Sequence, residues 1–353
     1  MNQEYTKRLQ EIEAELERWL QNQNSASISY NDIFPGLNLT KLNPQSLNAL
    51  FEPIRDMISR GGKRWRPLLM TLVCEALGGG ADSGKNKALV LTPLIEFCHN
   101  GSLIHDDLED NSDQRRGKPA VHHLYGIDTA INSGAFLYFL SLCCIELYDG
   151  NKEMVYKLYS EYMRKLHLGQ AMDISWHRDV TFVPKIEEYY IMCGLKTGSL
   201  ARLAAELGAI AAGAPQEVAR KLGETAEKLG VGFQILDDIK NLTTGNPGKK
   251  RGDDVVEGKK SLPVLLYLHK YPEKQEQIFY CFYQAKENGE TAPEIEELID
   301  ILTEAEIFME AEKIASSLIK EARDIFDSVC DNDSGVINEE GRALLNGLID
   351  LIS

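Results

Sequence analysis

The sequence predicts an all-α fold, a single large helical bundle, and three observations lead to that prediction. Almost every segment carries apolar residues at a helical period, and no segment alternates polar and apolar residues convincingly. Clusters of Gly, Pro, Asn and Asp separate these segments, at 34–44, 78–86, 148–152, 213–216 and 243–254. No change of composition and no linker divides the chain, so we expect one domain over residues 1–353.

The elements follow in order from this periodicity. Residues 1–20 form an amphipathic helix with Leu9, Ile12, Leu16 and Trp19 at helical spacing, and its many acids exclude a signal or transit peptide. Helices apolar on more than one face are typical of the centre of a bundle. The segments with this character are 87–110, 127–148, 199–213 and 221–240. We expect a core over about 45–270 and a C-terminal helical cap over about 271–353.

Charge and cysteine content narrow the possible partners and compartment. The net charge of −16 argues against nucleic acid or an anionic membrane surface as the main partner. An anionic substrate would therefore need a local basic site. The seven cysteines lie mostly in apolar segments without metal-binding spacing, which indicates core residues in a reducing compartment. We expect that no segment approaches the ~20 apolar residues of a spanning helix, and hence no transmembrane segment and a cytoplasmic location.

An acidic run ends the apolar segment 87–110. Asp106 and Asp110 lie one helical turn apart on the same face. Two carboxylates placed in this way can hold a hard cation such as Mg²⁺. Because the preceding residues are apolar, we expect this acidic end to face a cavity. The alternative is a solvated helix end with local salt bridges.

The pattern returns at 221–242, where Asp237 and Asp238 again follow an apolar helical run. Two buried helices that each end in Asp-Asp would repel each other without cations. Mg²⁺ prefers carboxylates together with phosphate oxygens, which suggests a diphosphate ligand. Basic residues suited to phosphate cluster at 63–66, 115–116, 249–251 and 259–260. Metal with acids, and a separate basic set, could hold two different phosphate groups.

Six motifs in order resemble those of the trans-isoprenyl diphosphate synthases, the head-to-tail prenyltransferases. They are GGKRWRP (61–67), HNGSLIHDDLEDNSDQRRGKP (99–119), GQAMD (169–173), KTGSL (196–200), FQILDDIKN (233–241) and GKKRGDDVVEGKKSLP (248–263). Their wording is most similar to the geranylgeranyl diphosphate synthase branch. The resemblance implies a helical bundle around a deep central cavity. It also implies that an allylic diphosphate ionises, the double bond of isopentenyl diphosphate attacks the cation, and a proton is lost.

The resemblance also implies roles for individual residues. Asp106, Asp110 and Asp237 would bind several Mg²⁺ ions on the allylic diphosphate, held further by Arg115, Lys196, Lys249 and Lys259. Isopentenyl diphosphate would bind Lys63, Arg66, His99 and Arg116, with Arg64 at a variable position. Gln170, Thr197 and Gln234 would line the carbocation, with Asp173 near the metals. The chain departs from the family at Asn241, where an aspartate usually ends the second motif.

The resemblance also implies that small residues before the first acidic motif allow a long product. Gly101 and Ser102, with Cys98 one turn deeper, would leave a tunnel open to products of twenty carbons or more, and Phe136 and Phe139 would form its floor. Family resemblance alone suggests a homodimer. One alternative is a class I terpene cyclase, which needs no second phosphate site. The other is a non-catalytic subunit, which typically loses an acidic motif.

Overall fold

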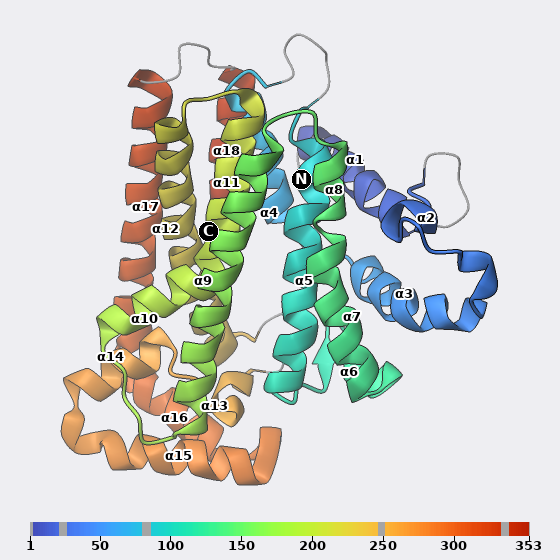
Figure 1. The fold of residues 1–353 in the computed structure, drawn as a ribbon. Helices are drawn as coiled ribbons and strands as arrows, with labels where there is room; N and C mark the ends of the chain where they lie inside the picture. The colour runs from blue at the N-terminus through green and yellow to red at the C-terminus, as the bar shows by residue number, and fades with distance from the viewer. Residues whose placement is uncertain (1–2, 21–26, 80–85, 246–250, 333–338, 353) are drawn as a thin grey trace. The chain divides into compact units, whose positions relative to one another are not determined.

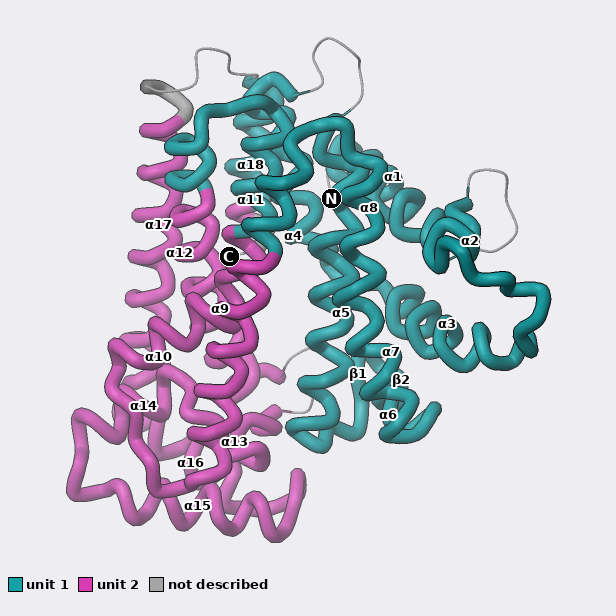
Figure 2. Tube along the Cα trace, in the orientation of Figure 1, with its two compact units in different colours: residues 1–159, 203–222, 330–348 teal, residues 160–202, 223–329, 349–353 magenta. Residues whose placement is uncertain are grey.

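Helices form nearly the whole protein. The computed structural model describes residues 3–20, 27–79, 86–245, 251–332 and 339–352 (Figure 1). Within these ranges the only strands form one short hairpin, so the predicted all-α class is confirmed. The chain divides into two compact units (Figure 2). The predicted single domain, with a cap beginning near residue 271, stays a prediction.

Unit 1 comprises residues 1–159, 203–222 and 330–348. Its first elements are α1 (Gln3–Leu20), α2 (Tyr30–Ile33), η1 (Leu39–Lys41), α3 (Pro44–Ser59), α4 (Trp65–Ala76), η2 (Leu89–Leu91) and α5 (Thr92–Glu109). They are followed by β1 (Gln114–Arg115), β2 (Lys118–Pro119), α6 (Val121–Tyr125), α7 (Ile127–Leu140) and α8 (Cys143–Leu147). Parts of α9 (Lys152–Arg178), α11 (Ser199–Ala212), α12 (Gln216–Thr243), α17 (Ile307–Asn332) and α18 (Glu339–Ile352) complete the unit.

The amphipathic pattern of the N-terminal residues places α1 against unit 1. Ile12, Leu16 and Trp19 are buried, and α1 packs on α4 and α5. At its N-terminal end the Tyr5 hydroxyl donates a hydrogen bond to the Leu344 carbonyl. Burial of one apolar face, rather than helix propensity alone, is what stabilises a helix of this length.

Glycine lets α5 and α7 pack closely, side by side (Figure 1). A Cβ atom added at Gly101 would lie 2.8 Å from the Gly134 carbonyl oxygen, and one added at Gly134 would lie 2.6 Å from His105 Nε2. Both separations are shorter than side chains tolerate. Gly101 is therefore required by the approach of the two helices, because it faces backbone, whereas a side chain at Gly134 would displace His105.

The hairpin β1–β2 follows directly after α5. Arg115 pairs with Lys118, and the two loop residues, Arg116 (φ 54°) and Gly117 (φ 73°), both have positive φ. Positive φ at both central residues is what a two-residue type I′ hairpin requires. Its strands are only two residues long, so periodicity in the sequence could not indicate them.

Unit 2 comprises residues 160–202, 223–329 and 349–353. It contains the remainder of α9, α11, α12, α17 and α18. Its other elements are α10 (Ile186–Cys193), η3 (Gly194–Gly198), α13 (Asp253–Glu257), α14 (Leu262–Lys270), η4 (Pro272–Lys274), α15 (Gln275–Asn288), η5 (Gly289–Thr291) and α16 (Pro293–Glu304). The unit has its own apolar core, which includes Ile235, Leu265, Phe282 and Leu298.

Among the described residues, one stretch has the length and hydropathy of a membrane-spanning helix. It runs from Ile127 to Leu147, and 44% of its apolar window is buried in the protein. The structure divides it into α7 and α8, and the 14 residues of α7 extend about 21 Å against about 30 Å for a bilayer core. By length and composition alone this stretch passes a test that, from the sequence, we expected no segment to approach, and core helices of globular proteins pass the same test.

Candidate active site

The first acidic pair divides into one accessible and one buried carboxylate. Asp106 is partly exposed, whereas Asp107 is fully buried. Arg115 Nε donates to Asp107 Oδ1 at 2.7 Å, and a terminal nitrogen of the same guanidinium contacts both Asp107 Oδ1 and, at 3.4 Å, Asp106 Oδ2. Asp107 therefore anchors the hairpin arginine to α5. Asp110 ends the helix and donates its backbone N–H to the Asp106 carbonyl.

The second acidic pair divides in the same way. Asp237 is partly exposed, and Asp238 is 6% exposed. Asp238 accepts hydrogen bonds from the Tyr189 hydroxyl (2.7 Å), Gln234 Nε2 (2.9 Å) and the Leu262 backbone N–H (3.2 Å). Burial raises the pKa of Asp238 to about 6, and the hydrogen bonds from Gln234 and Tyr189 oppose that rise.

Asn241 is buried among backbone groups. Its side chain is 1% exposed and its Oδ1 accepts the Asp254 N–H at 3.2 Å. Its carbonyl oxygen accepts the Gly252 N–H at 2.9 Å. The departure from the family motif therefore falls on a residue that ties α12 to the start of α13.

The predicted catalytic residues of unit 2 meet around a π-helical turn, η3. Lys196 Nζ lies 2.6 Å from Asp173 Oδ2, and Thr197 Oγ1 donates to Gln234 Oε1 at 2.8 Å. A Cβ atom at Gly169 would lie 2.4 Å from the Lys196 backbone nitrogen, so only glycine lets α9 approach this turn. Gln170, next to Gly169 on α9, is half-buried. Single π turns are frequent at functional sites.

Three of the predicted isopentenyl diphosphate ligands lie in one basic region of unit 1. Arg66 lies 3.5 Å from His99 Nε2, and its guanidinium stacks 4.4 Å above the Trp65 ring. Burial, and then the charges of Arg66 and Arg116, hold the pKa of His99 well below its usual value. These causes disfavour the charged form of His99, so the arginines carry the positive charge of this region. Lys63, the fourth predicted ligand, is exposed on the same segment.

The lysines of the last motif have different surroundings. Lys259 forms ion pairs with Glu257 and, at 3.9 Å, with Asp254. Lys260 is 2% exposed, and its amine lies 4.5 Å from the centre of the Phe282 ring. It is therefore not part of a surface cluster, and burial lowers its pKa to about 8. Lys249 lies outside the described residues.

The carboxylates suit a divalent cation, although they do not enclose one. In the described part of the chain, no three His, Cys, Asp or Glu side chains are grouped closely enough to hold a metal ion. Mg²⁺ commonly binds one or two carboxylates and takes its other ligands from water and substrate phosphates. Asp106 with Asp110, and Asp237, fit that kind of site because they are hard oxygen donors at partly exposed positions.

The predicted chain-length residues of α5 and α7 have different surroundings in the structure. Gly101 faces α7, and Cys98 is buried with its Sγ 3.3 Å from Ser141 Oγ. Phe136 packs against Phe34 and Phe51, with ring centroids 5.8 and 5.7 Å apart. Phe139 is 67% exposed and therefore does not form an interior floor in this chain. Ser102 is half-buried and shares a face of α5 with His99 and Asp106.

Sequence similarity covers both acidic motifs and every described basic residue discussed above. The polyprenyl synthetase family model matches residues 47–302. The chain belongs to the polyprenyl synthetase family. A geranylfarnesyl diphosphate synthase from Aeropyrum pernix is 33% identical over 305 residues, which cover 84% of this chain and 91% of that protein.

Solved structures of other polyprenyl synthetases share the fold. A geranylgeranyl pyrophosphate synthetase from Pyrococcus horikoshii Ot3 has a TM-score of 0.79 at 25% identity, covering 98% of this chain and 95% of that one. A polyprenyl synthase from Caulobacter crescentus CB15, solved with calcium and isoprenyl diphosphate, has a TM-score of 0.76 at 22% identity, covering 98% and 93%. At that identity the second likeness concerns the fold alone.

Sequence reasoning missed the residues that hold the predicted ligands in place. Asp107 and Asp238 are anchors, and Glu96 and Asn100 lie buried beneath the basic region. A signal for the last two was present, because they are polar residues one turn apart in an otherwise apolar helical segment.

Proposed function

We propose that the protein condenses isopentenyl diphosphate with an allylic diphosphate and releases a linear all-trans prenyl diphosphate and pyrophosphate. The observation that carries this proposal is the basic region of Arg66, His99 and Arg116. This region is separate in the sequence from the acidic motif of α12. None of its predicted ligands is a carboxylate that could bind a metal ion. A second, metal-independent diphosphate site distinguishes a condensing enzyme from a class I terpene cyclase.

The chemistry assigns each set of residues one task. Mg²⁺, held by Asp106, Asp110 and Asp237, would neutralise charge on the departing pyrophosphate. Lys196, Arg115 and Lys259 would bind the same leaving group, with Lys249 as a further ligand. The side chains of Gln170, Thr197 and Gln234 would direct their oxygens toward the allylic cation, while Asp173 orients Lys196. The departing pyrophosphate is the base that accepts the final proton.

Pyrophosphate release tests this function against both alternatives. We expect release from an allylic diphosphate only when isopentenyl diphosphate and Mg²⁺ are both present. Release from the allylic substrate alone would indicate a cyclase. No release under any condition would indicate a non-catalytic subunit.

We also propose a product of twenty carbons or longer. Two of the three proteins named above are a geranylfarnesyl diphosphate synthase and a geranylgeranyl pyrophosphate synthetase, and Ser102 is a small residue one turn before Asp106. The Ser102→Phe substitution should shorten the product, as measured by chromatography of products from labelled isopentenyl diphosphate. An unchanged length distribution would remove Ser102 from the chain-length wall.

A homodimer is the oligomeric state that we propose. Ile127, Ile131 and Phe139 lie on α7 with more than half of each side chain exposed, and a second copy of the chain would cover them. The Ile131→Asp substitution should lower the mass measured by light scattering from that of two chains to that of one. A wild-type mass of one chain would refute the dimer. A cytoplasmic location remains a proposal based on the buried cysteines.

A further inference from the structure

Two buried polar side chains lie on α5 beneath the basic region. Glu96 is 2% exposed and Asn100 is fully buried. Asn100 Nδ2 donates to Glu96 Oε1 at 2.8 Å and to the Glu96 carbonyl at 2.7 Å. A carboxylate that leaves water loses several kcal/mol of solvation unless it is paired and hydrogen-bonded. The reaction proposed above gives neither residue a chemical task, so their burial needs another explanation.

Two arginines from separate segments donate hydrogen bonds to this pair. Arg64 donates to Glu96 Oε1 at 2.6 Å. Arg116, from the hairpin loop, donates to Asn100 Oδ1 at 3.1 Å. An amide can serve both neighbours because its nitrogen donates to the carboxylate while its oxygen accepts from the guanidinium.

The backbone at both arginines is in the left-handed region. Their φ angles are 48° for Arg64 and 54° for Arg116. Such angles are uncommon for residues other than glycine and cost about 1 kcal/mol or more. Gly62 closes the other side of the Arg116 guanidinium, because a Cβ atom there would lie 3.0 Å from one of its nitrogens. Arg64 and Arg116 therefore both have a strained backbone, and both guanidinium groups point toward the buried pair of Glu96 and Asn100.

We propose that Asn100 and Glu96 are positioning residues that fix Arg116 for the diphosphate of isopentenyl diphosphate. The inference rests on the proposed function. Arg64 is the counter-charge that allows Glu96 to remain an acceptor inside the protein, and it does not itself contact substrate. This role explains why an arginine at a variable position of the first motif is 3% exposed.

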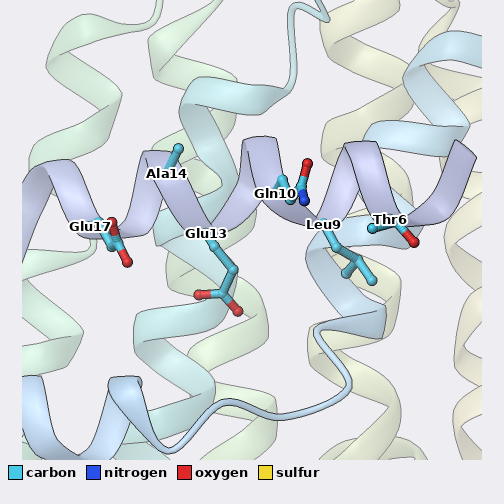
Figure 3. A pocket seen from close by; sticks show the side chains of 6 residues that line it. All are labelled: Thr6, Leu9, Gln10, Glu13, Ala14 and Glu17. Atoms are coloured by element: carbon cyan, nitrogen blue, oxygen red, sulfur yellow. The ribbon is translucent and has the colours of Figure 1, made fainter. Parts of the chain in front are cut away.

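The N-terminal helix extends the chain of contacts by one residue. Glu13 on α1 accepts a hydrogen bond from Arg64 Nε at 2.7 Å. Glu13 also lines a shallow depression of about 320 Å³, whose six lining residues all belong to α1 (Figure 3). We assign no ligand to that depression. Because Glu13 is partly exposed and farthest along the chain of contacts from Arg116, its replacement should have the smallest effect.

Steady-state kinetics with both substrates give the first test. The Asn100→Ala substitution should raise KM for isopentenyl diphosphate by about tenfold or more, the expected loss of a hydrogen bond to a charged group. KM for the allylic substrate should stay within about twofold. Asn86→Ala is the matched control, because it removes another amide of unit 1 that donates to Glu75 and to the Thr71 carbonyl. The control should leave both KM values unchanged.

Exchanging the carboxylate of Glu96 and the amide of Asn100 distinguishes a role in positioning Arg116 from a role in packing alone. Asn100→Asp alone should weaken isopentenyl diphosphate binding, because it places a second carboxylate against Glu96. In the double variant Glu96→Gln/Asn100→Asp, the introduced amide can again donate to the introduced carboxylate. Binding should therefore return to within about threefold of wild type. No recovery in a folded double variant would overturn the proposal.

Calorimetric titration with isopentenyl diphosphate in EDTA distinguishes failure of this inference from failure of the proposed function. If the wild type binds and Asn100→Ala binds equally well, the positioning role is wrong. If the wild type neither binds nor releases pyrophosphate from the substrate pair, the proposed function itself is wrong. If Asn100→Ala does not fold, the single and double exchange variants decide the matter by the same titration.

Discussion

Helices α5 and α12 each carry an Asp-Asp pair near the C-terminal end, but the buried aspartate of each pair is stabilised by different partners. In each, the first aspartate is partly exposed and the second is buried. Asp107 is buried against a cation, the guanidinium of Arg115. Asp238 is buried against three neutral donors, from Tyr189, Gln234 and Leu262. Neutral dipoles offset desolvation less than a full charge does, which is why the pKa of Asp238 rises to about 6.

The difference shows that one motif combines two functions. Under the proposed function, the first aspartate of each pair binds metal, and the second fixes the local structure that presents it. In unit 1 the anchor holds a hairpin arginine that belongs to the proposed site. In unit 2 it joins α10, α12 and the start of α14. The four predictions below test this division of roles.

The largest effect should come from the exposed member of each pair. We expect Asp106→Ala and Asp237→Ala each to lower kcat by about 10²–10³-fold, as loss of one group that stabilises transition-state charge commonly does. The midpoint of thermal unfolding should remain close to that of wild type, because both side chains are partly exposed. Near-normal turnover in either variant would remove that residue from the metal site.

The charge-paired anchor should matter most for stability. Asp107→Ala leaves Arg115 without its buried partner, and breaking a buried pair costs about 3 kcal/mol or more. Urea unfolding should show the loss. The matched Arg115→Met/Asp107→Leu variant should recover part of it, because apolar residues can replace a buried ion pair. Equal stability of Asp107→Ala and wild type would contradict the anchoring role.

The buried carboxyl of Asp238, which is held by neutral hydrogen-bond donors, should make the free energy of unfolding depend on pH. The pKa of Asp238 is raised from its usual 3.8 to about 6 in the folded protein. The folded state therefore binds more protons than the unfolded state between about pH 4 and 6, and this carboxyl lowers stability as pH rises through that window. Asp238→Asn should lack the dependence, so its unfolding free energy should improve relative to wild type by about 1–3 kcal/mol from pH 4 to 6. A difference that is constant with pH would argue against a raised pKa.

The last position of each motif should give a small effect on stability and the clearest contrast in activity. Asp110→Asn should lower kcat at limiting Mg²⁺, because an amide is a weaker magnesium ligand than a carboxylate. Asn241→Asp should not raise kcat, and it should cost about 1 kcal/mol because it places a charge at a position that is 1% exposed, even though the new carboxylate can still accept the Asp254 N–H. If Asn241→Asp increases the affinity for Mg²⁺, position 241 is a ligand after all.

Periodicity and motif order were sufficient to predict the all-α class and the family, because both depend on patterns that extend over many residues. Side-chain direction was not predictable to the same degree. Phe136 and Phe139 were assigned to one floor from the pocket that the family resemblance implies, yet the first packs on Phe34 and Phe51 and the second is exposed. Asn241 could be recognised only as a departure from the family motif, because the sequence does not reveal its contact with the Asp254 backbone.

The most direct measurement is Mn²⁺ binding in the presence of inorganic pyrophosphate, followed by electron paramagnetic resonance. The proposed roles require Asp106→Asn and Asp237→Asn each to reduce the number of bound ions. They also require folded Asp107→Asn and Asp238→Asn variants to bind as many ions as wild type. Loss of ions in the second pair of variants, with none lost in the first, would contradict the division into ligand and anchor.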